Sequence, residues 1–494
     1  MAAQSSVVLS DNAKSTLVSQ IHQDPGVPKP NPTVPTWQLP PHPLSDTQSA
    51  ELGQVTDFAI IGSGVTGCSV AKTLLENTES SGESVTVLEA RTLTSGATSR
   101  NAGFLLSAGP KNFLGMVERF GKDEAVAISK FCKMTLDKMA ELVVEAGPEV
   151  ESSCERRMVR CIIAFKDEKA LAAHVASIRL YEESFPEHKG LYSVIGRKEA
   201  QETYNLRDTA GALTTSAYVF WPYRFIPHLF EFLLRRYSAR FHVETRTPVT
   251  SVVYSPDTNE QYPYVLATSR GILRARQVFH CTNAFTGHLL PHLRGKIYPV
   301  RLTMSSQKRG SQFPNHGAQF CWMYYGSRSY EAESGVYESG MHFMQQNART
   351  GDLFFGGGTQ QIDQVVTSDD SEVSATAKRS VSTLLPEIYS KGWDGAPQVD
   401  KLWTGIIGCT ADQVPLVGRV PATLSRGRSR GGEWVAAGFN GYGMAMCWSS
   451  GEAIAKMALG EAVPEWLPRS LLVDEKRLRD EVRMGPGAAI KSLL

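Results

Sequence analysis

The alternation of apolar and polar positions is clearest between residues 57 and 89. A short apolar run at 58–61 leads into Gly62-x-Gly64-x-x-Gly67, a helical pattern follows over 68–76, and a second apolar run ends at Glu89. Short apolar runs bounded by turns are typical of buried strands, and an apolar stripe with a period near 3.6 is typical of a helix. This stretch therefore predicts a strand, a glycine turn, a helix and a second strand, which form one βαβ unit.

The rest of the chain mixes helical and strand-like patterns. Apolar spacing predicts helices over 113–146, 167–183, 198–204, 226–238, 371–385 and 444–458, and a possible short helix over 11–22. Strand-like runs occur at 156–165, within 241–284 and within 302–360. Residues 1–54 are rich in proline between Pro25 and Pro40, which favours an extended arm with Trp37 and Leu39 as possible anchors on the body.

The glycine turn has the spacing of a dinucleotide-binding motif. Gly62 permits a sharp turn, Gly64 leaves room for a pyrophosphate against the backbone, and Gly67 lets helix and strand pack closely. The helix that follows points its unpaired N–H groups at the phosphates. A carboxylate at Glu89 can accept hydrogen bonds from the ribose hydroxyls and repels a 2′-phosphate, so the motif favours FAD or NAD over NADP.

Composition and charge narrow the classes of partner. The 494-residue chain has 51 basic and 50 acidic residues, which gives no electrostatic basis for binding nucleic acid or an acidic membrane surface. No apolar run approaches the roughly 18 residues of a membrane span, and the N-terminus has no signal-peptide pattern. The eight cysteines lack metal-ligand spacing, so no metal site is expected. We expect a cytoplasmic protein; residues 491–494 resemble a peroxisomal tail only loosely, and the oligomeric state stays open.

Two further motifs carry a family resemblance. Residues 96–103 read GATSRNAG, and WTGIIGCTADQVPLVG at 403–418 is followed by GFNGYGM at 438–444. With the βαβ motif and Glu89, these resemble the FAD-dependent oxidoreductases of the D-amino-acid oxidase and glycine oxidase superfamily, nearest to gamma-glutamylputrescine oxidoreductase and D-amino-acid dehydrogenase. The implied fold class is α/β (α+β overall), with a Rossmann-like FAD-binding domain and a mixed-sheet substrate domain.

The resemblance also implies domain limits and cofactor contacts. The FAD-binding domain would comprise 55–155, 225–300 and 395–470, and the substrate domain 156–224 and 301–394, with an arm at 1–54 and a tail at 471–494. The expected FAD contacts are Gly62, Ser63, Gly64, Val65, Thr66, Gly67, Glu89, Ala90, Arg91, Thr98, Ser99, Arg100, Asn101, Ala102, Val249, Thr282, Gly408, Gly438, Asn440, Gly441, Tyr442, Gly443 and Met444.

Candidates for the substrate side come from an aromatic segment and a crossover strand. In the resembling family the stretch that enters the helix at 226 lies beside the substrate, which makes Tyr218, Trp221, Tyr223 and Arg224 candidates. Arg224 or Arg301 is expected to pair with a substrate carboxylate, if the substrate has one. The alternative is that these aromatic residues form the core of a sheet.

Two positions bear on the flavin chemistry. Sarcosine-oxidase-like members carry a lysine over the flavin that promotes reaction with oxygen, and this chain aligns Phe354 there, which favours a dehydrogenase or an oxidase with another cation. Those members also bond a cysteine to the ring, and this chain aligns Gly405 there, four residues before Cys409. We therefore expect non-covalent FAD.

The implied activity is oxidation of a C–N bond in a small-molecule amine or amino acid, by hydride transfer to flavin N5. One alternative is a tailoring oxidase or dehydrogenase of secondary-metabolite biosynthesis, since the aromatic clusters at 218–223 and 322–325 permit a roomier pocket. A second alternative is a flavin-binding protein without turnover.

Overall fold

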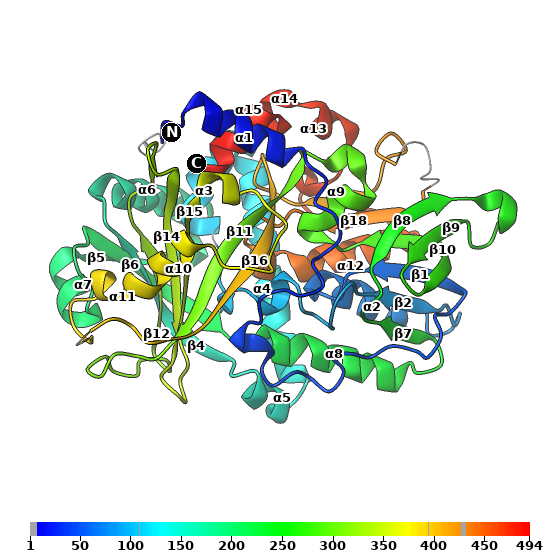
Figure 1. Cartoon of the computed structure of the whole chain (residues 1–494), viewed down its shortest axis with the longest axis horizontal. Helices are drawn as coiled ribbons and strands as arrows, with labels where there is room; N and C mark the ends of the chain where they lie inside the picture. Colours follow the sequence, from blue (N-terminus) through cyan, green and yellow to red (C-terminus); the bar gives the residue numbers. More distant parts are fainter. Residues whose placement is uncertain (1–6, 108, 394, 426–430) are drawn as a thin grey trace.

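A computed structural model describes residues 7–107, 109–393, 395–425 and 431–494. Two β-sheets stand side by side, with helices around them and an extended N-terminal segment across one face (Figure 1). The mixed α/β class expected from the sequence is confirmed.

The first sheet has a parallel core. Strands β18 (Glu433–Ala437), β10 (Gly271–His280), β1 (Val55–Ile61), β2 (Val85–Leu88) and β7 (Phe241–Glu244) run parallel in this order. Strand β17 (Leu416–Arg419) adds an antiparallel edge, and β8 (Val249–Tyr254) and β9 (Tyr264–Thr268) form a meander on β10. The βαβ unit predicted from residues 57–89 is present, with α2 (Val65–Asn77) between β1 and β2.

The second sheet is mixed. Its main order is β16 (Val399–Thr410), β11 (Ile297–Gln307), β15 (Leu353–Gln361), β14 (Val336–Gln346), β12 (Phe320–Tyr325), β4 (Arg157–Phe165), β6 (Gly211–Val219) and β3 (Phe104–Leu105). Strand β13 (Ser329–Glu331) pairs with β14, and β5 (Ser193–Gly196) pairs with β6. The segment 395–470 contributes to both sheets, because β16 pairs with β11 whereas β17 and β18 belong to the first sheet.

The longer helices match the ranges predicted from the apolar pattern, whereas α5, α9, α13, α14 and α15 were not predicted. They are α1 (Asp11–Ile21), α3 (Gly109–Phe120), α4 (Lys122–Glu145), α5 (Pro148–Ser153), α6 (Glu168–Ser184), α7 (Arg197–Tyr204), α8 (Pro222–Arg236), α9 (Thr286–Leu289), α10 (Ala375–Thr383), α11 (Leu385–Ile388), α12 (Cys447–Ala458), α13 (Glu475–Arg479), α14 (Glu481–Met484) and α15 (Pro486–Leu493). The helical pattern at 113–146 is divided into α3 and α4 at Gly121, whose φ is 86°. The predicted helix 371–385 starts late because Ser374 caps α10.

The core of the first sheet explains why residues 58–61 of β1 are all apolar. Phe58 and Ile60 pack with α2, α4, α8 and α12 on one face, whereas Ala59 and Ile61 pack with the β8–β9 meander on the other. Alternate side chains of a strand point to opposite faces, so a strand covered on both sides has no polar positions. The end of β1 and the start of α2 are therefore held rigidly.

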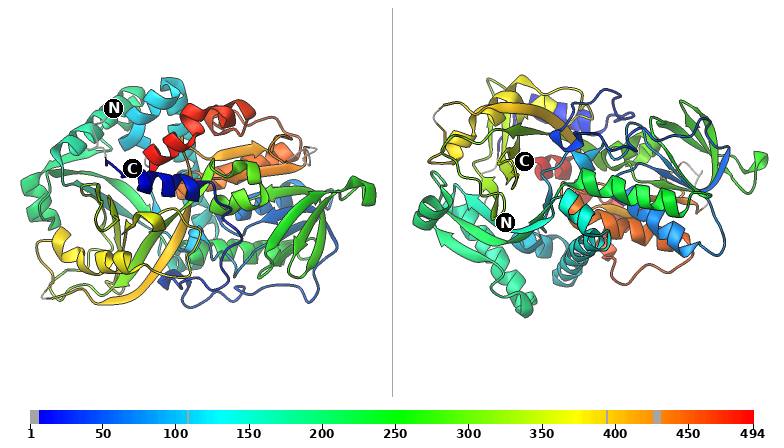
Figure 2. Two further views of the ribbon diagram at one scale, coloured as in Figure 1. Left: turned by 45° about the horizontal axis from the view of Figure 1, so that its top comes forward. Right: turned by 90° about the horizontal axis from the view of Figure 1, so that it is seen from below.

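The N-terminal segment is a built part of the fold. Helix α1 packs beside α15, and residues 22–54 then run over the region between the sheets before entering β1 (Figures 1 and 2). Trp37 is buried, donates from Nε1 to the Asn101 carbonyl at 2.7 Å, and stacks on Phe354 with ring centroids 4.2 Å apart. The expected anchoring by Trp37 is confirmed, whereas Leu39 is exposed.

A buried histidine in the second sheet predicts acid sensitivity. His342 on β14 is 7% exposed, neither ring nitrogen has a hydrogen-bond partner among the described residues, and burial lowers its pKa to about 4. In the unfolded chain the His342 imidazole has a pKa near 6.5, so it is protonated at a higher pH there than in the folded protein. The free energy of unfolding is therefore unaffected above about pH 6.5 and decreases by about 3 kcal/mol as the pH falls toward 4. Urea unfolding from pH 7 to pH 4 should show a shallower loss for His342→Leu than for wild type. The role given to His342 would be contradicted if His342→Leu lost as much unfolding free energy between pH 7 and pH 4 as wild type. It would also be contradicted if replacing the exposed His242 reduced that loss equally.

Candidate active site

One elongated cavity runs between the two sheets. Its wall includes the turn after β1, the end of β2, the loop 96–106, the turn after β10, parts of β11, β12, β14 and β16, and the segment 439–447 before and into α12. Because the ends of the parallel strands β1, β2 and β10 meet here, segments far apart in sequence share one wall. Residues from all three sequence motifs therefore meet in one space.

The glycines of the turn after β1 stand where a side chain would have no room. Gly62 has a φ of 108°, and a Cβ there would lie 2.6 Å from the Cys281 carbonyl oxygen. A Cβ at Gly67 would lie 2.0 Å from the Gly62 carbonyl oxygen, so Gly67 serves helix packing and does not line the cavity. Helix α2 begins at Val65, whose amide donates to Thr98 Oγ1 at 3.1 Å, and its N-cap residue Gly64 has no side chain to accept from the other amides of the first turn. These remaining amides beside bare backbone fit a pyrophosphate.

Glu89 stands at the end of β2 on the same wall. Its Oε2 accepts from the Ser63 amide at 3.1 Å and from Ser63 Oγ at 2.6 Å, and its Oε1 accepts from the Arg91 amide at 3.0 Å. Oε1 therefore retains one acceptor site for a further donor, whereas Ser63 occupies both acceptor sites of Oε2. Val249, the first residue of β8, lines the same end of the cavity. This end fits an adenosine.

The loop before α12 forms the wall at the other end. Gly438 and Gly441 have φ values of 79°, and Asn440 has a φ of 54°. The Asn283 side chain holds this turn, because its Oδ1 accepts from the Gly438 and Phe439 amides at 3.0 and 3.3 Å. Two residues of this wall, Gly441 and Gly443, have no side chain, which fits the close approach of a flat ring. The predicted helix 444–458 begins only at Cys447, after a short 3-10 turn.

Most expected cofactor residues line this cavity. They are Gly62, Ser63, Gly64, Val65, Thr66, Glu89, Ala90, Arg91, Thr98, Arg100, Asn101, Ala102, Val249, Thr282, Asn440, Gly441, Tyr442, Gly443 and Met444. Four others lie behind the wall: Gly67, Ser99, Gly408 and Gly438. A Cβ at Gly408 would meet Asn283 Oδ1 at 2.5 Å, and one at Gly438 would meet Thr410 Cγ2 at 2.7 Å. These two glycines therefore allow the loops to pack, and direct contact with the cofactor stays a prediction for the residues on the wall.

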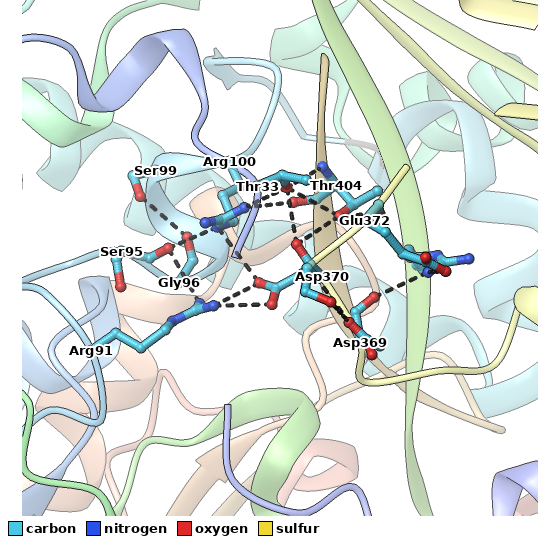
Figure 3. A network of polar contacts seen from close by, with 12 residues as sticks. Thr33, Arg91, Ser95, Gly96, Ser99, Arg100, Asp369, Asp370, Glu372 and Thr404 are labelled. Carbon is cyan, nitrogen blue, oxygen red and sulfur yellow. Dashed lines mark hydrogen bonds and ion pairs between the residues drawn. The ribbon is translucent and has the colours of Figure 1, made fainter. Parts of the chain in front are cut away.

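The two arginines of the loop after β2 are tied into a buried polar network (Figure 3). Arg91 Nη1 donates to both carboxylate oxygens of Asp370 at 3.0 and 2.8 Å. Arg100 donates from Nε to the Ser95 carbonyl at 2.8 Å and from Nη1 to the Thr404 carbonyl at 2.8 Å, and its Nε lies 3.7 Å from Asp370. Both guanidinium groups hold the cavity wall in place.

The cavity lining does not include the substrate-side candidates Trp221, Tyr223, Arg224 and Arg301, whose role at the substrate stays a prediction. Trp221 and Tyr223 are buried with Trp37, which is the core alternative. Arg224 donates to the Ser153 carbonyl and stacks over Trp221. Arg301 donates to the Asp369 carbonyl at 3.2 Å. The family resemblance placed Trp221, Tyr223 and Arg224 beside the substrate. In the structure Trp221 and Tyr223 pack against Trp37 of the N-terminal segment. Arg301 lies on β11.

Phe354, which the sequence aligned over the flavin, does not line the cavity either. Phe354 lies in the core against Trp37, whereas Gly357, three residues further along β15, lines the cavity. The identity of residue 354 therefore carries no information on a cation over the ring. Gly405 does line the cavity, and Cys409 packs away from it with Tyr298 and α1.

Two parts of the wall were missed. Gly26, Val27 and Pro28 of the N-terminal segment cover the cavity, and Lys111 at the start of α3 reaches into it. Lys111 lies among Phe104, Leu106, Met323, Met341 and Phe343, so the cavity continues beyond the glycine loops into an apolar compartment. A single lysine in the apolar first turn of a helix was the available signal. The proline-rich composition around Gly26, Val27 and Pro28 did not indicate that these residues line the cavity.

Solved structures share this architecture. Glycine oxidase from Geobacillus kaustophilus aligns with a TM-score of 0.63 at 17% identity, over 86% of this chain and 99% of that one. L-proline dehydrogenase from P. horikoshii aligns with a TM-score of 0.58 at 18% identity, over 85% and 97%. L-amino acid deaminase from Proteus vulgaris, in a form with its specific insertion sequence deleted, aligns with a TM-score of 0.57 at 15% identity, over 88% and 98%. At these identities the likeness concerns the fold.

Other comparisons bear on class. No curated protein sequence matches this chain. Among the described residues, no helix is both long and apolar enough to cross a membrane, and no group of three or more His, Cys, Asp or Glu residues is arranged to hold a metal ion. A family model with the description FAD dependent oxidoreductase matches residues 57–457, which include every element of the cavity from β1 to α12. The chain therefore belongs to the family of FAD dependent oxidoreductases.

Proposed function

We propose that this protein oxidises a C–N bond of a small-molecule amine or amino acid, with non-covalent FAD as its cofactor. One observation carries the proposal: the turn after β1, Glu89 and the glycine loop before α12 line a single cavity that continues into an apolar compartment. Bound FAD would supply the two-electron acceptor, taking a hydride at N5 from the carbon that bears the nitrogen. Water then hydrolyses the imine product.

The chain would bind the cofactor at three places. The turn at 62–66 and the start of α2 hold the phosphates, Glu89 accepts from the ribose hydroxyls, and the loop 440–444 lies against the ring. Backbone amides fixed in a loop stabilise negative charge that develops on reduction without having to reorient. The rigid loops therefore favour the reduced state.

The apolar compartment would position the substrate. Phe104, Met323, Met341 and Phe343 line it and exclude water. Excluding water favours a neutral amine, whose lone pair assists loss of the hydride, so this step needs no general base. Orientation of the reacting carbon is the main contribution of these side chains.

The cysteines on the cavity wall support non-covalent binding. Cys281 and Cys447 line the cavity, and burial raises the pKa of both thiols, that of Cys447 to about 12. A protonated thiol is a poor nucleophile. Acid precipitation is therefore expected to release all of the flavin into the supernatant.

Anaerobic titration tests the proposed activity. The FAD-loaded protein is mixed with D-amino acids, N-methyl amines and polyamines while flavin absorbance near about 450 nm is followed. Rapid bleaching by one class is expected and identifies the substrate class. Stable binding of FAD without bleaching by any of these compounds would indicate a flavin-binding protein without this activity.

A further inference from the structure

Lys111 is a buried cation on the wall of the apolar compartment. It belongs to the first turn of α3, its side chain is 3% exposed, and it lines the cavity. Its Nζ donates to Tyr325 Oη at 2.6 Å, lies 3.7 Å from Met323 Sδ, and is 5.1 Å from the centre of the Tyr325 ring. These contacts fix the ammonium group at the C-terminal end of β12.

The described residues provide Lys111 with no carboxylate partner. Its hydrogen-bonding neighbours are a hydroxyl and a thioether, and the other side chains that influence its pKa are those of Tyr442 and Cys161. Burial lowers the pKa of Lys111, as expected for an ammonium group removed from water without a counter-ion. Burying an unpaired cation is unfavourable, so a ligand that brings a negative charge gains from filling this position.

The surroundings complete a small anion site. Tyr325 accepts from Lys111 through its hydroxyl oxygen and stacks on Phe165 with centroids 5.1 Å apart, so it holds the ammonium group in place. Tyr442, from the loop before α12, lines the same cavity and brings a second hydroxyl. The rest of the compartment wall is apolar, so the charge of Lys111 is poorly screened there.

We propose that Lys111 binds the carboxylate of the substrate, with Tyr325 as its positioning residue, so that the substrate class is amino acids and other amines bearing a carboxylate. This inference rests on the proposed function and narrows it. It replaces Arg224 and Arg301 in that role, because neither lines the cavity. Plain amines and polyamines would meet a cation of like charge at this position, which disfavours their binding.

A matched pair of probes tests the site without turnover. Phenylacetate and phenylacetamide have the same shape and differ in charge, and their binding to the FAD-loaded protein can be measured by the change in flavin absorbance and by thermal shift. Wild type should prefer phenylacetate by at least about 30-fold, the loss usual when one member of a buried charged hydrogen-bonded pair is removed. Lys111→Met should abolish the preference, and Lys111→Arg should retain part of it.

Controls and outcomes are distinct from those of the proposed function. Lys133→Met, at an exposed position of α4, should leave the preference unchanged. Lys111→Met should fold, because replacing a buried charge by an apolar side chain of similar volume is often neutral or stabilising. A preference that persists in Lys111→Met, or is absent in wild type, would overturn the site. Loss of preference in Lys111→Met together with an unreactive flavin would support the site and argue against the proposed activity.

Discussion

Gly62→Ala is expected to weaken FAD binding by about 100-fold or more. Alanine at a φ of 108° is strained, and its Cβ would overlap the Cys281 carbonyl oxygen at 2.6 Å. Backbone strain costs about 1–3 kcal/mol, and overpacking adds about 1–3 kcal/mol. Both are relieved by moving the turn, which displaces the amides that face the phosphates. Fluorescence titration of the apoprotein with FAD measures the loss.

Gly82→Ala is the matched control. Gly82 also has a positive φ, 75°, but a Cβ there would meet no atom within 4 Å, and the residue does not line the cavity. Its substitution should lower stability slightly and leave FAD affinity unchanged. Equal FAD affinities in Gly62→Ala and wild type would show that the turn after β1 is not the phosphate site.

Asp370→Asn is expected to lower the free energy of unfolding by about 3 to 5 kcal/mol, the usual loss when one partner of a buried ion pair is removed. Asp370 is 1% exposed and is the anionic partner of Arg91 and Arg100 in the described network (Figure 3). Arg100 remains charged near neutral pH, because burial lowers its pKa only to about 10. The neutral amide would leave two guanidinium groups buried without a counter-charge. Urea unfolding measures the difference.

Asp370→Asn is also expected to weaken FAD binding, because the same network holds the cavity wall. The Asp370 carbonyl oxygen also accepts from the Thr33 amide at 2.8 Å, so the network joins the N-terminal segment to the loop that lines the cavity.

Asp137→Asn is the control for stability. It removes an ion pair with Lys133 at a position 54% exposed and should change the free energy of unfolding by less than about 1 kcal/mol. A similar small effect of Asp370→Asn would contradict the role given to the network.

The cofactor motifs could be predicted because each is local. The turn at Gly62, the acid at Glu89 and the loop at 440–444 depend on backbone geometry within a few residues, and the family resemblance placed all three. The substrate side could not be predicted in this way. Arg224 is chemically suited to bind a carboxylate, but β6 and α8 direct it toward Ser153 and Glu155.

By itself the sequence determined the βαβ unit, the longer helices and the glycine loops that line the cavity, since periodicity and glycine geometry act over short distances. Only the tertiary structure decided which side chains reach the cavity. Lys111 enters it because α3, which packs on α4 and α6, places the Lys111 side chain beside Tyr325 of β12. Phe354 is excluded because Trp37, more than 300 positions earlier in the chain, covers it. Such contacts depend on which distant elements pack together, and the apolar pattern of a single segment does not specify its packing partners.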